Sequence, residues 1–305
     1  MLHIETPLIM STALSRHCGR PVYLKMEALQ PSGSFKLRGI GHVCEFHYRR
    51  GIRHFLSSSG GNAGIAVAVA GRRLGVPVTV IVPESTSQRA LEVLQLEAAE
   101  VRVHGASWKE AHEMAQSLQT ADNALLHPFD DPLLWTGHAT MIDEVVAAGV
   151  KPDVVVLSVG GGGLLCGVAE GLLRNELGTV PILAVETIGA DSLSQALKAG
   201  QRIELPGITS IATSLGARMV CARAFELTRQ RTIHSLVVSD KAAVDASLHF
   251  LDDHRILVEP ACGAALAVIY ERVPLIERHR EILVIVCGGA GVTVKTLETL
   301  ARTLS

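Results

Sequence analysis

The sequence has few aromatic residues and no hydrophobic run long enough to cross a membrane. Phe, Trp and Tyr together make up 4% of the 305 residues. Apolar runs such as residues 154–157 and 282–287 have the length of a strand, well short of the roughly 20 residues that a membrane-spanning helix needs. Residues 1–7 lack both the basic and the apolar segment of a secretion signal. We therefore expect a soluble, cytoplasmic protein with no membrane partner.

An excess of charge of either sign is also absent. The chain carries 28 Lys and Arg residues against 30 Asp and Glu residues, which gives a formal net charge of -2. This balance indicates neither a nucleic-acid partner nor an anionic membrane surface. The length is ample for a buried core and is more typical of two lobes than of one.

Paired cysteines and metal motifs are missing as well. The six cysteines are scattered without a Cys-x-x-Cys pair, and His112-Glu113 is not followed by a second histidine at the metalloprotease spacing. In a chain of this size, the pattern favours reduced thiols in a cytoplasm over a disulfide framework or a zinc site. The cysteines are Cys18, Cys44, Cys166, Cys221, Cys262 and Cys287.

What the chain does contain is an alternation of strand-like and helix-like segments. The apolar run 154–159 is typical of a strand buried on both faces of a parallel sheet, and residues 62–74 have helical spacing and end before Gly75. Further strands are expected at 54–57, 76–82, 101–103, 124–127, 182–186, 235–238 and 282–287, and further helices at 35–50, 88–97, 107–119, 133–148, 164–177, 192–198, 241–252, 259–272 and 293–302. The pattern predicts an α/β fold with two open, twisted, mostly parallel sheets flanked by helices, since roughly ten strands would be unusual in one such sheet.

One lysine stands at the start of a predicted helix. Pro31 and Gly33 are turn formers, Ser34 can cap the helix, and Lys36 falls in its first turn. The positive end of the helix dipole and burial both disfavour an ammonium there, so the neutral, nucleophilic amine becomes easier to reach. Such an amine suits a Schiff base, whereas a solvated surface lysine is the alternative.

Residues 57–64 form a second feature, a hydroxyl- and glycine-rich turn between a strand and a helix. Free backbone N–H groups at a helix N-terminus bind anions, and the serine hydroxyls add donors. A carboxylate is a suitable guest. The alternative is an ordinary turn in which Asn62 acts as an Asx-type cap.

A third feature is the run of four glycines within residues 158–164, again between a strand and a helix. Such a loop lets the backbone wrap closely around an anion. A dinucleotide fingerprint fails because Leu165 or Cys166 stands where its last glycine or alanine belongs, and the P-loop fails because Val168 follows Gly167. We interpret the loop as a phosphate cup for a mononucleotide-sized ligand. The alternative is a close helix–strand contact that needs small residues.

Two chemically active residues end predicted strands. Because ligands of open α/β sheets gather at the carboxyl ends of the strands, Cys287 and Glu186 are placed to face one. A buried inert thiol and a solvated carboxylate are the ordinary alternatives.

Together these motifs resemble the fold type II (tryptophan synthase β-like) pyridoxal-phosphate enzymes and, within them, the liver-type L-serine/L-threonine dehydratases. The similar blocks are residues 6–8, 31–41, 128–132, 157–167 and 256–267. The resemblance implies a homodimer, a large cofactor-binding domain of residues 1–37 and 138–305, and a small substrate-side domain of residues 38–137.

The resemblance also implies a role for each residue of the site. Lys36 would carry the cofactor and act as the base, Phe35 would pack on one face of the pyridine ring, and Ser214 would cover the other face. Asn62 would bind the ring's 3'-oxygen and Cys287 would face the ring nitrogen. The phosphate would be held by Gly160, Gly161, Gly162, Gly163 and Leu164, and the substrate carboxylate by Ser59, Gly60, Gly61 and Asn62.

A monovalent cation, K⁺, is implied too. Its expected ligands are Glu186, Ala190 and Ser192, with backbone carbonyls near Gly160, Leu215 and Ala217.

The activity implied is α,β-elimination of L-serine to pyruvate and ammonia, and of L-threonine to 2-oxobutyrate. A thiol such as Cys287 is a poor counter-ion for a protonated ring nitrogen, which favours elimination over transamination. A β-replacement synthase, a serine racemase-like enzyme and an inactive cofactor-binding relative remain alternatives.

Two departures from the family's pattern carry expectations of their own. Gly60 stands where relatives commonly have alanine, so we expect an altered tolerance for the methyl group of threonine and a looser carboxylate turn. The chain ends at Ser305 without the segment that brings feedback control to biosynthetic threonine dehydratases, so we expect no such control.

Overall fold

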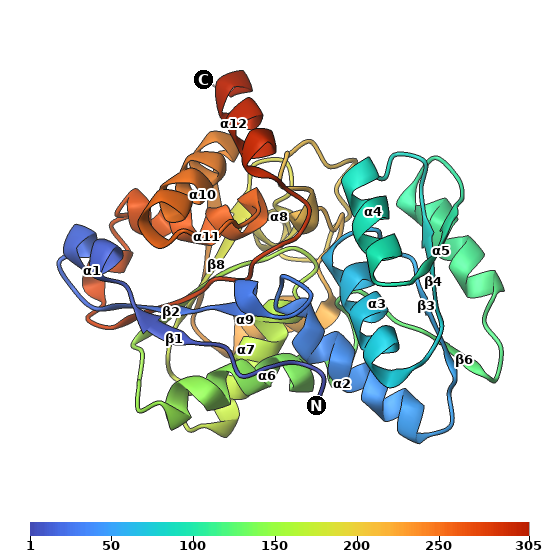
Figure 1. The fold of residues 1–305 in the computed structure, drawn as a ribbon. Coiled ribbons are helices and arrows are strands. Elements are labelled where there is room, and N and C mark those ends of the chain that lie inside the picture. The colour runs from blue at the N-terminus through green and yellow to red at the C-terminus, as the bar shows by residue number, and fades with distance from the viewer. Residues whose placement is uncertain (305) are drawn as a thin grey trace.

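Two sheets organise the chain in the computed structural model, which describes residues 1–304 (Figure 1). The six-stranded sheet has the spatial order β1 (Leu8–Met10), β2 (Val22–Lys25), β10 (Ile282–Ile285), β7 (Val154–Ser158), β8 (Ile182–Thr187) and β9 (Ile233–Val238). The four-stranded sheet has the order β5 (Glu100–Val103), β4 (Val78–Val82), β3 (His54–Ser57) and β6 (Asn123–Leu125). We call the part of the chain built on the first sheet the large lobe and the part built on the second the small lobe.

Nearly all strand pairs are parallel. Among the paired strands of the described residues, only β1 and β2 run antiparallel. The predicted α/β class with two mostly parallel sheets is thus confirmed. Because parallel strands point the same way, their carboxyl ends meet at one edge of each sheet, and the loops that follow β3, β7 and β10 gather there.

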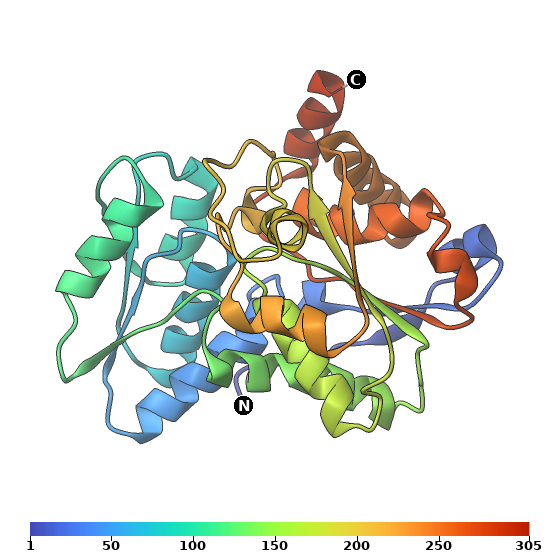
Figure 2. The same cartoon turned by 180° about the vertical axis from the view of Figure 1, so that it is seen from behind.

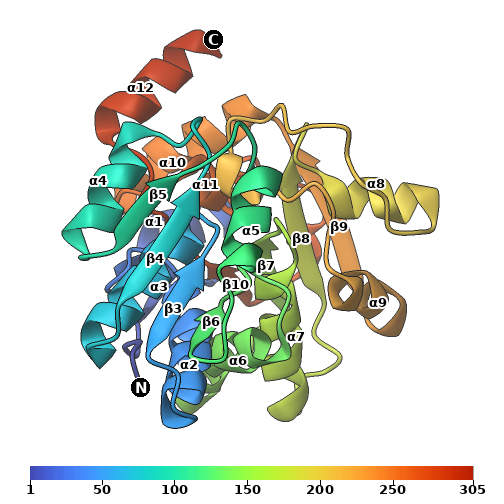
Figure 3. The ribbon, with the colours of Figure 1, turned by 90° about the vertical axis from the view of Figure 1, so that its right-hand side faces the viewer.

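Helices cover both faces of each sheet. They are α1 (Thr12–Cys18), α2 (Lys36–Arg49), α3 (Asn62–Leu74), α4 (Gln88–Leu96), α5 (Trp108–Ser117), α6 (Pro132–Ala147), α7 (Gly163–Arg174), α8 (Ser192–Ala199), α9 (Ala222–Gln230), α10 (Asp240–His254), α11 (Pro260–Tyr270) and α12 (Val294–Thr303), with short 3₁₀ turns η1 (Glu27–Leu29), η2 (Thr213–Leu215) and η3 (Ile276–Arg278). In the large lobe, α10 and α11 lie on one face and α6 and α7 on the other (Figures 1 and 2). In the small lobe, α3 and α4 lie on one face and α5 on the other (Figure 3).

The core of the large lobe lies around its central strands. All five residues of β7 are buried, as are all four of β10, and their side chains are almost entirely aliphatic. This is the pattern expected of strands covered on both faces. A rigid sheet therefore supports the loops at its carboxyl edge.

No helix or strand is predicted in residues 1–30 or 218–232, yet the structure has β1, α1, β2, η1 and α9 there. β1 has only three residues and leaves Ile9 and Met10 exposed, so it shows no alternation. α1 has only seven residues, although Ser11 caps it. α9 begins after Cys221 without a side-chain cap. Short or uncapped elements give a weak local signal, and packing against the large sheet stabilises them.

The division into domains stays a prediction. The strands of the four-stranded sheet all lie within residues 54–125. The predicted boundaries after residues 37 and 137 fall inside α2 and α6, two helices that pack against each other. None of the helices in residues 1–304 combines the length and apolar character needed to span a bilayer.

Candidate active site

Lys36 is the first residue of α2 and so lies in the first turn of this helix, as the sequence predicts. Its Nζ donates a hydrogen bond to the Pro128 carbonyl oxygen at 2.5 Å and lies 5.2 Å from the centroid of the Phe35 ring. Burial lowers the pKa of Lys36 from 10.5 to about 8. The neutral amine is therefore far more accessible near neutral pH than that of a solvated lysine.

The start of α2 is capped from another helix. The expected cap, Ser34, was a wrong prediction: its Oγ is buried and has no partner among the described residues. The backbone of Ser34 instead forms a bridge with Gly288, which leaves Phe35 as the residue before the helix. A histidine of α6 supplies the side-chain acceptor instead: the Gly39 N–H, in the first turns of α2, donates to His138 Nδ1 at 3.2 Å. The His138 ring also packs against Phe35, with centroids 4.9 Å apart.

Cys287 lies beside this helix start and is buried. Its carbonyl oxygen accepts a hydrogen bond from the Phe35 N–H at 3.0 Å. A hydrogen bond with the Cys262 thiol and burial raise the pKa of Cys287 well above its ordinary value. The side chain is therefore a neutral thiol near neutral pH.

Asn62 begins α3 and joins the small lobe to the large lobe. Its Nδ2 donates to Glu259 Oε2 at 2.9 Å and to Ser214 Oγ at 3.2 Å, and its Oδ1 accepts the Ala290 N–H at 3.0 Å. The alternative of an Asx-type cap is wrong, because Gly61 precedes the helix and the amide of Asn62 reaches across the lobes instead.

The four glycines of the predicted phosphate cup lead from β7 into α7. A Cβ at Gly161 would lie 2.3 Å from Cγ of Phe129, and one at Gly160 would lie 3.1 Å from Cα of Leu215. Gly162 has a φ of +95°, which side chains rarely adopt. Close packing thus requires small residues here, while the first turn of α7, which includes Leu164, presents N–H groups without a helical partner. The free N–H groups fit a phosphate group, whereas the close contacts with Phe129 and Leu215 also fit the alternative of a tight contact that needs small residues.

The predicted substrate turn connects β3 to α3. Ser57 Oγ accepts the Ser59 N–H at 3.3 Å, and Ser59 Oγ accepts the Gly61 N–H at 3.4 Å. These bonds hold Ser59, Gly60, Gly61 and Asn62 together at the N-terminus of a helix. The turn therefore has the arrangement expected of an anion-binding site.

Gly60 is closely surrounded by side chains of its own lobe. A Cβ at this position would lie 2.9 Å from Thr86 Cγ2 and 3.1 Å from Val82 Cγ1. The methyl group of an alanine at this position would therefore meet these two side chains.

Glu186 is the penultimate residue of β8 and is not a solvated carboxylate, so that alternative is wrong. It has no exposed surface; Oε1 accepts the Leu193 N–H and Oε2 the Ser194 N–H, both at 2.8 Å. Burial raises the pKa of Glu186 to about 8. The neighbouring Ser192 Oγ is buried without a partner among the described residues, and Ala190 is buried in the same loop. A buried carboxylate beside a spare hydroxyl oxygen fits a cation that prefers oxygen ligands.

The remaining predicted cation residues lie at η2. Leu215 packs against Gly160, and its carbonyl oxygen accepts the Ala217 N–H at 2.8 Å. The Glu186 loop and this segment are linked, since Thr187 Oγ1 and Ser210 Oγ are 2.8 Å apart and Ser210 Oγ accepts the Ala212 N–H.

Four residues of the site were not assigned a role from the sequence: Pro128, Phe129, His138 and Glu259. Pro128 and Phe129 join Lys36 to the glycine loop, since one accepts the amine's hydrogen bond and the other packs on Gly161. These two residues and Glu259 lie inside blocks that resemble the family, a signal that points to them. His138 lies in no such block.

Comparisons with known proteins agree with this geometry. The family model described as "Pyridoxal-phosphate dependent enzyme" matches residues 1–288. The chain is 49% identical to "Serine dehydratase-like" from Mus musculus, over 98% of this chain and 94% of that protein. It is 46% identical to "L-serine dehydratase/L-threonine deaminase" from Homo sapiens, over 99% of this chain and 96% of that protein. A solved fungal L-serine ammonia-lyase from Rhizomucor miehei superposes with a TM-score of 0.94 at 31% identity, covering 100% of this chain and 99% of that one.

Proposed function

The chain belongs to the fold type II pyridoxal-phosphate dependent enzymes, and on this premise we propose that it is an L-serine/L-threonine ammonia-lyase. The reaction is the α,β-elimination that turns L-serine into pyruvate and ammonia, and L-threonine into 2-oxobutyrate and ammonia. Relatives named for this activity cover almost the whole chain, and they favour it over a β-replacement synthase, a racemase or an inactive relative. The single observation that carries the proposal is a buried Lys36 amine of lowered pKa beside a neutral Cys287 thiol.

Lys36 has two tasks in this proposal. Its amine would hold the cofactor covalently through the cofactor's aldehyde group, and Lys36 Nζ would act as the base that takes the proton from the substrate Cα. Pyridoxal phosphate, when bound, supplies a ring that withdraws electrons from that carbon. A pKa of about 8 suits a base that must be neutral before the step and protonated after it.

Cys287 and Phe35 set the surroundings of the ring. Phe35 would pack on one face of the ring, and the Cys287 thiol would face the ring nitrogen. Because the raised pKa keeps this thiol neutral, the Cys287 side chain offers no negative charge to hold a proton on that nitrogen. This supports prompt elimination over reactions that need a longer-lived carbanion.

The anionic groups of the ligands are assigned to two helix N-termini. Gly160, Gly161, Gly162, Gly163 and Leu164 hold the phosphate at the start of α7, and Ser59, Gly60, Gly61 and Asn62 hold the substrate carboxylate at the start of α3. Backbone N–H groups and the positive end of the helix dipole favour negative charge at both places.

A monovalent cation, K⁺, is part of the proposal. Its ligands are Glu186, Ala190 and Ser192 together with carbonyl oxygens of Gly160, Leu215 and Ala217. The buried carboxylate of Glu186 and the spare Ser192 hydroxyl support this assignment. The cation would hold the loop after β8 beside the glycine cup.

Three further assignments belong to the same proposal. Residues 1–37 and 138–305 form the cofactor-binding domain and residues 38–137 the substrate-side domain. The protein acts in the cytoplasm, which is supported by its six unpaired cysteines. It forms a homodimer, which is supported by Ile9 and Met10 exposed on the edge strand β1.

The proposal is tested with the purified protein and added pyridoxal phosphate. Borohydride should bleach the absorption band of the bound cofactor and leave the reduced label on the peptide that contains Lys36. L-Serine should then yield pyruvate with the unreduced protein, and the Lys36→Ala variant should yield none. A wild-type protein that forms no 2-oxo acid from any hydroxyamino acid would contradict the proposal, and D-serine among its products would favour a racemase.

A further inference from the structure

Glu259 is a buried carboxylate at the centre of the candidate site to which the proposed reaction gives no role. It is 6% exposed and precedes α11. Its backbone is firmly held, because its carbonyl oxygen accepts the N–H groups of Cys262 at 2.8 Å and Gly263 at 2.9 Å. The side chain therefore extends from a fixed point in the large lobe.

The carboxylate collects donors from three separate segments. Oε2 accepts from Asn62 Nδ2 at 2.9 Å and from Ser214 Oγ at 2.6 Å, and Oε1 accepts the Gly291 N–H at 2.6 Å. The backbone after Cys287 wraps around the group, since a Cβ at Gly289 would lie 2.2 Å from Cδ of Glu259. Each segment carries a residue that the proposed function places around the cofactor ring.

Glu259 also decides which way the Asn62 amide points. The Ala290 N–H needs an acceptor, which Oδ1 supplies, and the Glu259 carboxylate needs donors, which Nδ2 supplies. An ionised carboxylate accepts through both oxygens and donates nothing, so it opposes the flipped orientation. The two contacts together fix the donor side of the amide.

We propose that Glu259 is a positioning residue for the cofactor ring: its carboxylate orients the Asn62 amide and holds Ser214 and the segment after Cys287 in place. The inference rests on the proposed function, because the roles of Asn62 and Ser214 at the ring belong to it. Glu259 acts through these neighbours and need not touch a reacting atom.

The substitution Glu259→Gln removes this role at nearly constant shape. A glutamine side chain has one acceptor oxygen and one NH₂ group. Its NH₂ must face either the Gly291 N–H or the donors of Asn62 and Ser214. One donor therefore always meets another donor, and the amide of Asn62 loses its fixed orientation.

The test measures cofactor binding separately from turnover. Cofactor-free wild type and Glu259→Gln are titrated with pyridoxal phosphate, and the absorption spectrum of the bound cofactor is recorded, since its bands report protonation at the ring oxygen that Asn62 binds. We expect the dissociation constant to rise at least tenfold and the ratio of the bands to change. Glu271→Gln, an exposed glutamate just after the same helix, is the matched control and should match wild type in both.

A second variant background separates positioning from a general structural role. If Glu259 acts through Asn62, then Glu259→Gln should weaken binding much less in an Asn62→Ala protein than in wild type. Equal losses in both backgrounds, or wild-type affinity and band ratio in Glu259→Gln, would overturn the inference.

Misfolding of Glu259→Gln and inactivity of the wild type would each call for a different conclusion. If Glu259→Gln does not fold, Ser214→Ala removes one donor from an exposed loop, and an unchanged affinity and spectrum in that variant would overturn the inference. A wild type that binds the cofactor but forms no 2-oxo acid would contradict the proposed reaction and leave the binding comparison intact. A wild type that binds no cofactor would overturn both.

Discussion

The Arg38 guanidinium donates two hydrogen bonds to the Glu27 carboxylate, from Nε to Oε2 at 2.7 Å and from Nη2 to Oε1 at 2.8 Å. Neither side chain has any exposed surface. Arg38 also donates to Glu144 on α6 at 2.6 Å, and Lys25 pairs with that same carboxylate. Arg38 lies two residues after Lys36, so these ion pairs connect the helix that carries the Lys36 amine to η1 and α6 and, through Glu144, to β2.

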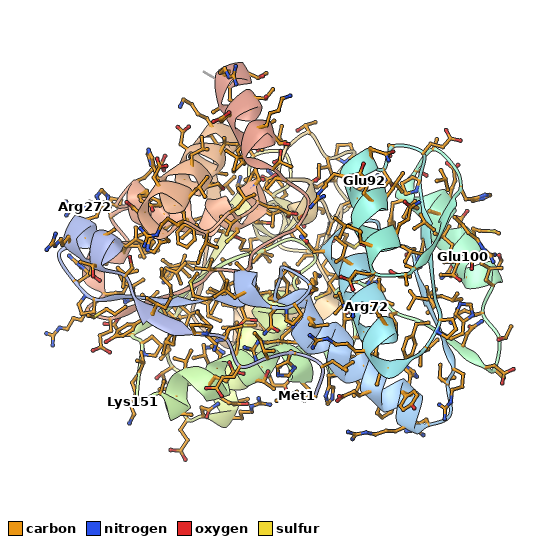
Figure 4. All side chains as sticks on the ribbon, viewed as in Figure 1. Met1, Arg72, Glu92, Glu100, Lys151 and Arg272 are labelled. Carbon is orange, nitrogen blue, oxygen red and sulfur yellow. The ribbon has the colours of Figure 1, made fainter. Side chains whose placement is uncertain are left out.

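The first prediction concerns this ion pair. Arg38→Met should lower the free energy of unfolding by about 3–5 kcal/mol, because it leaves the Glu27 charge buried without its partner. The control is Arg72→Met, which removes the exposed Arg72 (labelled in Figure 4) from its ion pair with Glu97 and should cost about 0–1 kcal/mol. Urea unfolding of both variants measures the difference. An equal loss of unfolding free energy in both variants would show that the buried ion pair stabilises the fold no more than the surface pair does.

The second prediction concerns the glycine of the substrate turn. Gly60→Ala should lower the free energy of unfolding by about 1–3 kcal/mol, because the new methyl group would meet Thr86 Cγ2 at 2.9 Å. It should also raise the KM for L-serine by displacing the turn. Adding Thr86→Ser removes the clashing methyl group and should recover most of both losses. A double variant no better than the single one would place the strain elsewhere.

The third prediction is a pH dependence of stability. Burial lowers the pKa of His138 well below 6.5 in the folded protein, so the unfolded chain binds a proton that the folded chain refuses. This contribution is complete above pH 6.5, and stability falls as the pH is lowered below that value. His138→Gln should reduce the acid slope of the free energy of unfolding by about 1.4 kcal/mol per pH unit. His104→Gln, at an exposed position, is the control and should keep the wild-type slope.

The fourth prediction concerns the amine itself. Because burial lowers the pKa of Lys36 to about 8, the neutral form should predominate above that pH. The rate at which cofactor-free protein captures pyridoxal phosphate should therefore rise with pH and level off with a midpoint near 8. Stopped-flow absorbance measures this rate. A midpoint near the ordinary lysine value of 10.5 would contradict the environment described for Lys36.

The fifth prediction concerns the proposed cation. Exchange of K⁺ for tetramethylammonium, a much larger cation whose methyl groups keep oxygen ligands away from its charge, should lower the turnover of wild type severalfold. Glu186→Gln should lower turnover in K⁺ and lose most of its response to the exchange, because the carboxylate that attracts the cation is gone. A variant that still responds to K⁺ as wild type does would place the cation elsewhere.

Local sequence patterns predicted most of the helices and strands, because a helix end or a buried strand depends mainly on residues that are close together in the chain. The helix at residues 62–74 ends where Gly75 adopts a φ of +67°, and β7 is buried throughout as its aliphatic run requires. The prediction that Ser34 caps α2 was wrong because a distant residue provides the acceptor. His138 lies 99 residues along the chain from Gly39, whose N–H it accepts. Glu259 was overlooked for the same reason, since its partner Asn62 is 197 residues away. Neither contact leaves a periodic trace in the sequence.

The contacts of Asn62 also have a consequence for how the protein is made. Its amide is held by Glu259 and by Ala290, residues 197 and 228 positions further along the chain. Contacts between such distant residues form late in folding, because a long loop must close before they contribute. A nascent chain on the ribosome therefore cannot complete the site until residue 290 has left the exit tunnel, so partly synthesised copies are unable to begin catalysis.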